Sequence, residues 1–178
     1  IKSTALIKKA YAERFPDLQT SYSLAVADVE TDVIHGTKEI TMMSITYKNR
    51  VFTAVIKDFV SGIANVQAKF REKMDKYLGH VIEARKIQFD MIIVDNPIEA
   101  VREALKKAHE WKPDFLSFWN MDFDITKILE ACDKYGVDPR DLFSDPSVPK
   151  QYRYFKYKRG LSKKVTASGL VTPIKPAA

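Results

Sequence analysis

Hydrophobic positions recur at helical and then at strand spacing along the first third of the chain. Apolar residues at near-helical intervals predict a short helix over residues 3–15, ended before Pro16. The nearly continuous apolar run over residues 22–29 predicts a strand buried on both faces. Residues 40–47 and 51–59 are rich in β-formers and are separated by a turn-length interval, so the three strands are expected to form an antiparallel meander.

Helices and strands alternate in the next part of the chain. A charged segment over residues 65–88 has apolar positions at helical periods, and short apolar runs at residues 90–94 and 115–119 predict strands. Helix-start and helix-stop signals predict two further helices, one over residues 96–112 and one from about residue 125 to Gly136. Hairpin-linked strands followed by helix-linked strands predict an α/β fold, a mixed sheet with flanking helices.

The length of 178 residues suits one domain, and the charge is unevenly placed along it. Residues 146–178 carry eight basic residues and no acidic one, whereas residues 1–145 carry 21 basic and 23 acidic residues. We interpret residues 1–145 as an α/β core and residues 146–178 as a basic, aromatic, hairpin-like segment of the same domain. Interleaved basic and aromatic side chains suit single-stranded nucleic acid, and a solvated tail is the alternative.

Composition narrows the classes of function further. No apolar run approaches the ~20 residues that span a bilayer, and no signal peptide opens the chain, so neither membrane insertion nor secretion is expected. The single cysteine, Cys132, is expected to be a buried hydrophobe, and the histidines lack a second ligand at metal spacing. The six glycines are scattered singly, which argues against a phosphate-binding loop.

Two acidic residues interrupt the end of the most apolar strand. Asp28 and Glu30 are two positions apart, so their side chains point to the same face of a strand and can converge on one divalent ion. A carboxylate in such a strand needs a partner, a place at the strand end or a metal. An exposed strand end is the plainer interpretation of the pair.

A second polar cluster lies where a buried strand passes into a helix. It comprises Asn120, Asp122, Phe123 and Asp124, at the sheet edge where α/β proteins usually bind ligands. Helix capping by Asp122 or Asp124 explains one acid of this cluster. It leaves the asparagine and the second aspartate without a role.

Together these clusters resemble the DEDD 3′–5′ exonucleases, which are ribonuclease-H-like proofreading enzymes. Asp28-Val-Glu-Thr31 is similar to their first motif, and Asn120-x-x-Phe-Asp124 is similar to their second. The approach over residues 110–120, with a helix that ends at Pro-Asp before the strand, resembles the family B DNA polymerases. The resemblance covers about residues 20–136 and implies a ribonuclease-H-like fold.

The resemblance implies a two-metal site for Mg²⁺ or Mn²⁺. Asp28, Glu30 and Asp124 would be both the catalytic residues and the metal ligands, with Asp122 as the fallback for Asp124. The DNA contacts it implies, and those expected from charge, are Thr31, Asn120, Phe123, Arg153, Lys156, Lys158, Arg159, Lys163 and Lys164. The substrate would be a single-stranded 3′ end or a frayed primer terminus, hydrolysed to 5′-mononucleotides. The partner would be the polymerase domain of a longer chain, in the cytoplasm of a bacterial or phage-infected cell.

The family's third motif supplies one more aspartate, and this sequence has no acidic residue after Asp145. The chain is therefore expected to stop before the helix that carries that motif. The basic region lies where family B polymerases insert a hairpin, whose arms here would be residues 152–157 and 163–167 with the turn at 158–162. Two alternatives stay open: a non-catalytic nucleic-acid-binding module of the same fold, and a nucleotide-sugar transferase that uses Asp122 and Asp124 as its metal site.

Overall fold

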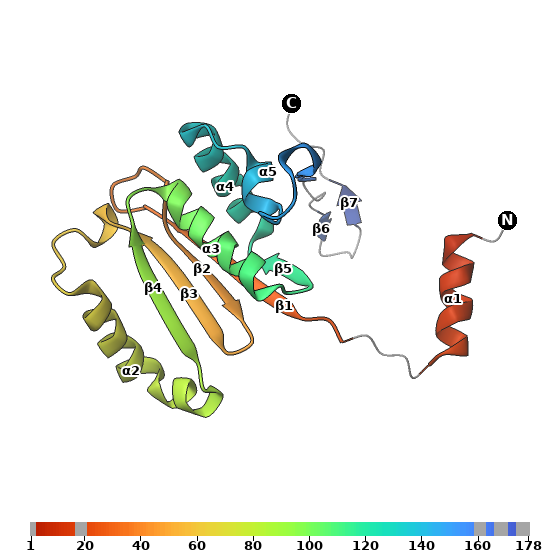
Figure 1. The fold of residues 1–178 in the computed structure, drawn as a ribbon, viewed down its shortest axis with the longest axis horizontal. Coiled ribbons are helices and arrows are strands. Elements are labelled where there is room, and N and C mark those ends of the chain that lie inside the picture. Colours follow the sequence, from red (N-terminus) through yellow and green to blue (C-terminus); the bar gives the residue numbers. More distant parts are fainter. Residues whose placement is uncertain (1–2, 17–20, 159–162, 166–170, 174–178) are drawn as a thin grey trace.

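The computed structural model describes residues 3–16, 21–158, 163–165 and 171–173 of the chain. Its centre is a five-stranded mixed sheet in the order β4-β3-β2-β1-β5 (Figure 1). The strands are β1 (Leu24–Thr31), β2 (Ile40–Tyr47), β3 (Arg50–Ile56), β4 (Gln88–Val94) and β5 (Phe115–Phe118). Strands β1, β2 and β3 form the expected antiparallel meander, while β4 runs parallel to β3 and β5 runs parallel to β1.

Helices complete the α/β architecture. They are α1 (Thr4–Arg14), α2 (Val66–Arg85), α3 (Pro97–Trp111), α4 (Met121–Tyr135) and α5 (Pro139–Phe143), with 3₁₀ turns at Asp58–Val60 and Lys150–Tyr152. Helix α3 packs across β2 and β3, and α4 contacts β1, β2 and β5. Helix α2 lies beside β4, where Phe70 stacks on Phe89 with ring centroids 5.0 Å apart (Figure 1). The α/β prediction is confirmed, and the sheet is compatible with a ribonuclease-H-like fold.

The core lies between one face of the sheet and helices α3 and α4. Strand β1 contributes Ala25, Ala27 and Val29 to it, and α4 contributes Ile128, which is fully buried. Helix α3 begins as its sequence predicts, because the Asn96 side chain accepts a hydrogen bond from the backbone N–H of Glu99 at 3.1 Å. The core thus joins β1 to α4 through buried apolar side chains.

The expected burial of β1 on both faces is wrong. Exposed and buried residues alternate along the strand, and Leu24 and Val26 are 52% and 40% exposed on the face away from the core. An apolar run is typical of a strand covered on both sides, but helices of the described chain cover β1 on one side.

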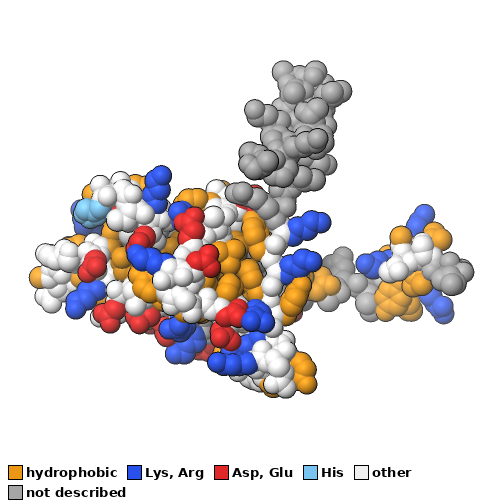
Figure 2. All heavy atoms as spheres, turned by 90° about the horizontal axis from the view of Figure 1, so that it is seen from above, with side chains coloured by type: hydrophobic (Ala, Val, Ile, Leu, Met, Phe, Trp, Pro, Cys, Tyr) orange, Lys and Arg blue, Asp and Glu red, His pale blue; other side chains and the backbone are white. Residues whose placement is uncertain are grey.

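None of the residues of α1 is buried, and Figure 2 shows apolar and basic side chains next to one another on its surface.

Some element boundaries and one strand pairing also differ from the expectations. Strand β3 ends at Ile56, before the 3₁₀ turn, and α4 begins at Met121 rather than near residue 125. The predicted pairing of residues 152–157 with 163–167 is also wrong, because β6 (Lys163–Val165) pairs antiparallel with β7 (Val171–Pro173). The segment before them packs on the domain instead, so its inward side chains do not need a partner strand. Most of the predicted turn, residues 159–162, lies outside the described chain.

Candidate carboxylate site

The parallel pairing of β1 with β5 determines where the candidate acids meet. Ala27 lies opposite Phe118, the last residue of β5, and the chain then turns directly into α4. The carboxyl end of β1 therefore lies beside the first turn of α4. Asp28 and Glu30 alternate with buried residues of β1, so both are exposed on the face opposite the core, as their spacing predicts.

A register shift in β1 marks the end of this acidic stretch. The pairing with β2 changes between Glu30 and Thr31, and the hydroxyl of Thr41 donates a hydrogen bond to the Glu30 carbonyl at 3.3 Å. Such irregularities bend a strand and redirect its side chains, and they are common next to active sites. Thr31 is half-buried at this bend.

Asp124 lies in the first turn of α4 and is only 1% exposed. Its Oδ2 atom accepts a hydrogen bond from the backbone N–H of Asn120 at 3.2 Å, and the N–H of Val29 in β1 also donates to this carboxylate. Burial raises the pKa of Asp124 above its ordinary value, and the negative charges of Asp28 and Glu30 raise it further. The structure therefore brings the three predicted acids into one electrostatic group.

The donor set of this group consists of carboxylate oxygens, which suit Mg²⁺ or Mn²⁺ better than zinc. In the described part of the chain, no three Asp, Glu, His or Cys side chains are placed closely enough to hold a metal ion as they stand. The chemistry of the three acids fits a divalent ion, because such an ion would neutralise the like charges that raise the pKa of Asp124. Their present separation does not amount to a closed ligand shell.

Asn120 is the N-cap residue of α4. Its Oδ1 atom accepts a hydrogen bond from the N–H of Phe123 at 3.4 Å, so neither Asp122 nor Asp124 provides the cap. Residues two apart on a helix do not face one another. The Asp122 carboxylate accepts a hydrogen bond from the hydroxyl of Tyr157, while Asp124 turns towards β1. This divergence argues against a shared metal site of these two acids and places Asp122 outside the group.

The residues from Arg153 to Lys158 form a segment without regular secondary structure, which lies next to α4. Inward and outward side chains alternate along it. Three inward side chains anchor it: Arg153 bonds to Asp141, Phe155 stacks on Phe143 with ring centroids 4.5 Å apart, and Tyr157 bonds to Asp122. The outward side chains are those of Tyr154, Lys156 and Lys158.

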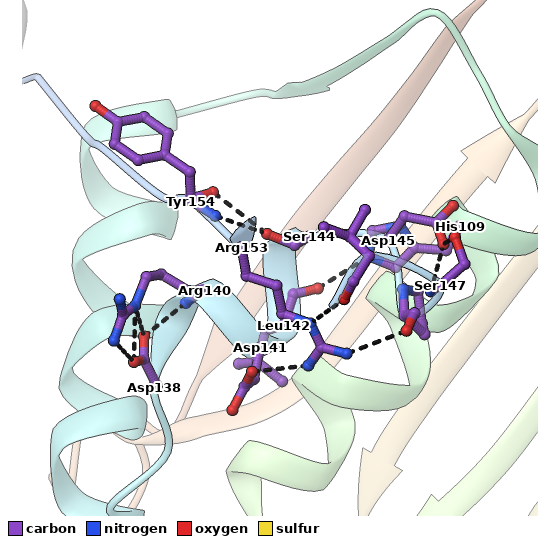
Figure 3. Close-up of polar contacts among 12 residues, drawn as sticks. His109, Asp138, Arg140, Asp141, Leu142, Ser144, Asp145, Ser147, Arg153 and Tyr154 are labelled. Carbon is purple, nitrogen blue, oxygen red and sulfur yellow. Dashed lines mark hydrogen bonds and ion pairs between the residues drawn. The ribbon is translucent and has the colours of Figure 1, made fainter. Parts of the chain in front are cut away.

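Arg153 is largely occupied by this anchoring role. Its guanidinium bonds to Asp141 at 2.7 Å, to the carbonyl of Val148 at 2.9 Å and to the carbonyl of Pro146 at 3.1 Å (Figure 3). Tyr154 points away from these contacts in the same view (Figure 3). Of the other predicted cationic contacts, Lys156 and Lys158 are exposed on this segment. Arg159 and the side chains of Lys163 and Lys164 lie outside the described part of the chain.

Sequence reasoning missed the role of Asp32, which closes the loop after β1. This buried carboxylate accepts hydrogen bonds from the N–H groups of Ile34 and His35 at 3.1 and 3.0 Å and from the Thr37 hydroxyl at 2.8 Å. The bond from His35, followed by that from Thr37, lowers the pKa of Asp32 from 3.8 to about 2. An aspartate followed by residues of turn character was the available signal.

The remaining predicted side chains have ordinary packing roles. Cys132 is buried on α4, as expected, and burial raises the pKa of its thiol to about 11. The His109 ring is hydrogen-bonded to the Leu142 carbonyl at 3.0 Å, and that of His35 lies 3.3 Å from Asp32. None of the described helices combines the length and the apolarity needed to cross a bilayer.

Comparison of the sequence with known proteins does not assign it to a family. The sequence matches no protein-family model, and no curated protein matches it. What remains as evidence of function is the carboxylate site and the basic segment beside it.

Proposed function

We propose that this chain is a metal-dependent 3′–5′ exonuclease domain, the proofreading part of a longer family B-like DNA polymerase, with a ribonuclease-H-like fold. The observation that carries the proposal is the environment of Asp124. This acid comes from a helix that follows β5, yet it is buried against β1, where the charges of Asp28 and Glu30 act on it. Two sequence motifs that are far apart in the chain thus share one edge of the sheet.

The geometry supports different roles for the three acids. Asp28 and Glu30 are exposed on one face and are available to bind divalent ions together. Asp124 is held in place by two backbone N–H groups, so its orientation is set before any ligand binds. Bound divalent ions would activate the attacking water and neutralise the leaving oxygen, which is the chemistry that phosphodiester hydrolysis needs. The water oxygen would bond to phosphorus, the bond from phosphorus to the 3′ oxygen would break, and that oxygen would be protonated.

The surroundings of the site support a nucleic-acid substrate. Phe123 is 40% exposed in the first turn of α4, next to the acids. The anchored segment places Lys156 and Lys158 beside the same turn, because Tyr157 between them is bonded to Asp122. Lysines that lie next to an acidic site bind the phosphates of a strand that would otherwise be repelled. In the proposal Thr31, Asn120 and Phe123 contact the terminal nucleotides.

The test is release of mononucleotides from a 3′-labelled single-stranded DNA oligonucleotide with Mg²⁺ or Mn²⁺. The chain is compared with its Asp28→Ala variant and with Asp75→Ala, which removes an exposed acid from α2. The proposal expects metal-dependent release that is lost in the first variant and kept in the second. Release that persists in Asp28→Ala would contradict it.

One observation favours a second candidate, a non-catalytic nucleic-acid-binding module of the same fold. The sequence has no acidic residue after Asp145 that could supply the aspartate of the third motif. Binding of the oligonucleotide with no release in either metal would support this second candidate. A longer version of the protein, extended beyond Ala178, separates the two, because activity that appears on extension would favour the enzyme.

A further inference from the structure

The indole of Trp119 is 89% exposed, the largest exposure among the exposed hydrophobic side chains of the described chain. Phe118 immediately before it is only 8% exposed and belongs to the core. The chain's other tryptophan, Trp111, stacks on Tyr47 with ring centroids 6.3 Å apart. No ring contact within the described residues involves Trp119, so packing of the domain does not account for a tryptophan at this position.

The position of Trp119 in the sheet is adjacent to the candidate acids. Strands β1 and β5 are parallel, and Ala27 lies opposite Phe118. The next residue along β1 is Asp28, and the next residue after β5 is Trp119. Asn120 follows at once and bonds through its N–H to Asp124. A large exposed aromatic ring thus follows the strand end at which Asp28 and Asp124 are brought together.

The surface around this ring has the composition of a single-strand binding site. Met121 and Phe123 are 47% and 40% exposed on the next turn of chain. Lys156 and Lys158 are exposed on the segment that Tyr157 fastens to Asp122 in the same turn of α4. Aromatic faces that bind bases, together with cations that bind the backbone, are how proteins hold single strands without reading their sequence.

We propose that Trp119 is a base-stacking residue, which holds an unpaired base of a single strand beside the carboxylate site. The inference rests on the proposed nucleic-acid substrate and adds the residue that positions it. Stacking on a flat ring is tolerant of base identity, because every base has a π-face. The site therefore accepts any terminal base, and a duplex end must fray before its base reaches the indole.

Fluorescence tests this directly in a Trp111→Phe background, where Trp119 is the only tryptophan. A single-stranded oligonucleotide is titrated in EDTA, so that metal-dependent hydrolysis does not proceed, and affinity is measured in parallel by anisotropy of a labelled oligonucleotide. The expected result is quenching of Trp119 on binding. In the otherwise unchanged chain, Trp119→Ala should weaken binding on the order of 5- to 150-fold, with a smaller loss for Trp119→Phe.

Tyr77→Ala is the matched control, since Tyr77 is a 60% exposed aromatic residue on α2 with Lys73 and Lys76 near its ring. It should leave affinity unchanged. Binding of the oligonucleotide without quenching, or an affinity of Trp119→Ala within about twofold of the parent, overturns the stacking role and leaves the proposed function standing. If no variant binds the oligonucleotide, the stacking role is overturned too. The proposed function is then tested separately by the assay of mononucleotide release.

Discussion

Removal of the Asp124 side chain is expected to destabilise the protein, although this acid belongs to the proposed functional site. The carboxylate is 1% exposed and accepts the backbone N–H groups of Asn120 and Val29. Alanine leaves both donors without their acceptor, which costs about 1–3 kcal/mol for the N–H of the buried Val29 and less for that of the exposed Asn120. Relief of the burial and of the like charges that raise the Asp124 pKa offsets part of this loss. The expected net change is about 1–3 kcal/mol, or roughly 2–12 °C in Tm for a domain of this size.

The matched variant Asp28→Ala should have almost no effect on stability. Asp28 is exposed on the open face of β1, and no hydrogen bond or ion pair joins its side chain to another described residue. Exposed substitutions of this kind usually stay within about 0.5 kcal/mol. Both variants should nevertheless lose metal-dependent hydrolysis, because each removes a carboxylate of the same group. Asp124→Asn should fall between them in stability, since its amide oxygen still accepts one backbone N–H.

Urea unfolding followed by far-UV circular dichroism measures the two stabilities, and the 3′-labelled oligonucleotide measures activity on the same samples. Equal stability of the Asp124→Ala and Asp28→Ala variants would refute the assigned role of the buried hydrogen bonds. Unfolding of Asp28→Ala would show instead that Asp28 is a structural carboxylate. Loss of activity in a variant counts only where its unfolding curve shows that the protein is folded under assay conditions.

Three smaller perturbations have expected outcomes set by the described contacts. The pKa of Asp32 lies below its ordinary value, so this carboxylate stabilises the fold above about pH 4, and its contribution is lost as the pH falls from 3.8 to about 2. The stability of Asp32→Ala should therefore fall less steeply with acid than that of the parent, and an unchanged acid-unfolding curve would contradict this. Cys132 should react with a thiol reagent only after denaturation, because burial raises the pKa of its thiol to about 11; rapid labelling of the folded protein would contradict this. Asn120→Asp should keep the N-cap of α4 and leave the Tm of the protein unchanged, whereas Asn120→Ala should lower the free energy of unfolding by about 1 kcal/mol. An equal loss of stability in both variants would rule out the capping role.

Most of the sheet was predictable because its strands carry their own signals. Strand β2 has the expected bounds, and the helix caps at Asn96 and Gly136 are used as their residue types indicate. Burial of β1 was not predictable in the same way. Leu24 and Val26 are apolar whether or not a helix covers them, so only the packing of the whole domain shows that their face is open.

The basic segment shows a second limit of local pattern. Its alternation of aromatic and basic residues is that of a strand, and inward and outward side chains do alternate from Arg153 to Lys158, although these residues form no strand. The pattern does not say what the inward face packs against. Here Phe155 meets Phe143 and Tyr157 meets Asp122, so the domain surface takes the place of a partner strand.

The site itself depended on one feature that the local sequence does not contain. With the helix expected from residue 125, Asp122 and Asp124 lie together in a loop, and only the resemblance ranks Asp124 before Asp122. The observed start at Met121 places both in a helical turn, where residues two apart diverge, and this separates an acid bonded to Tyr157 from an acid buried against β1. Sequence spacing places carboxylates at two strand ends, but the parallel pairing of β1 with β5 is what makes those ends meet.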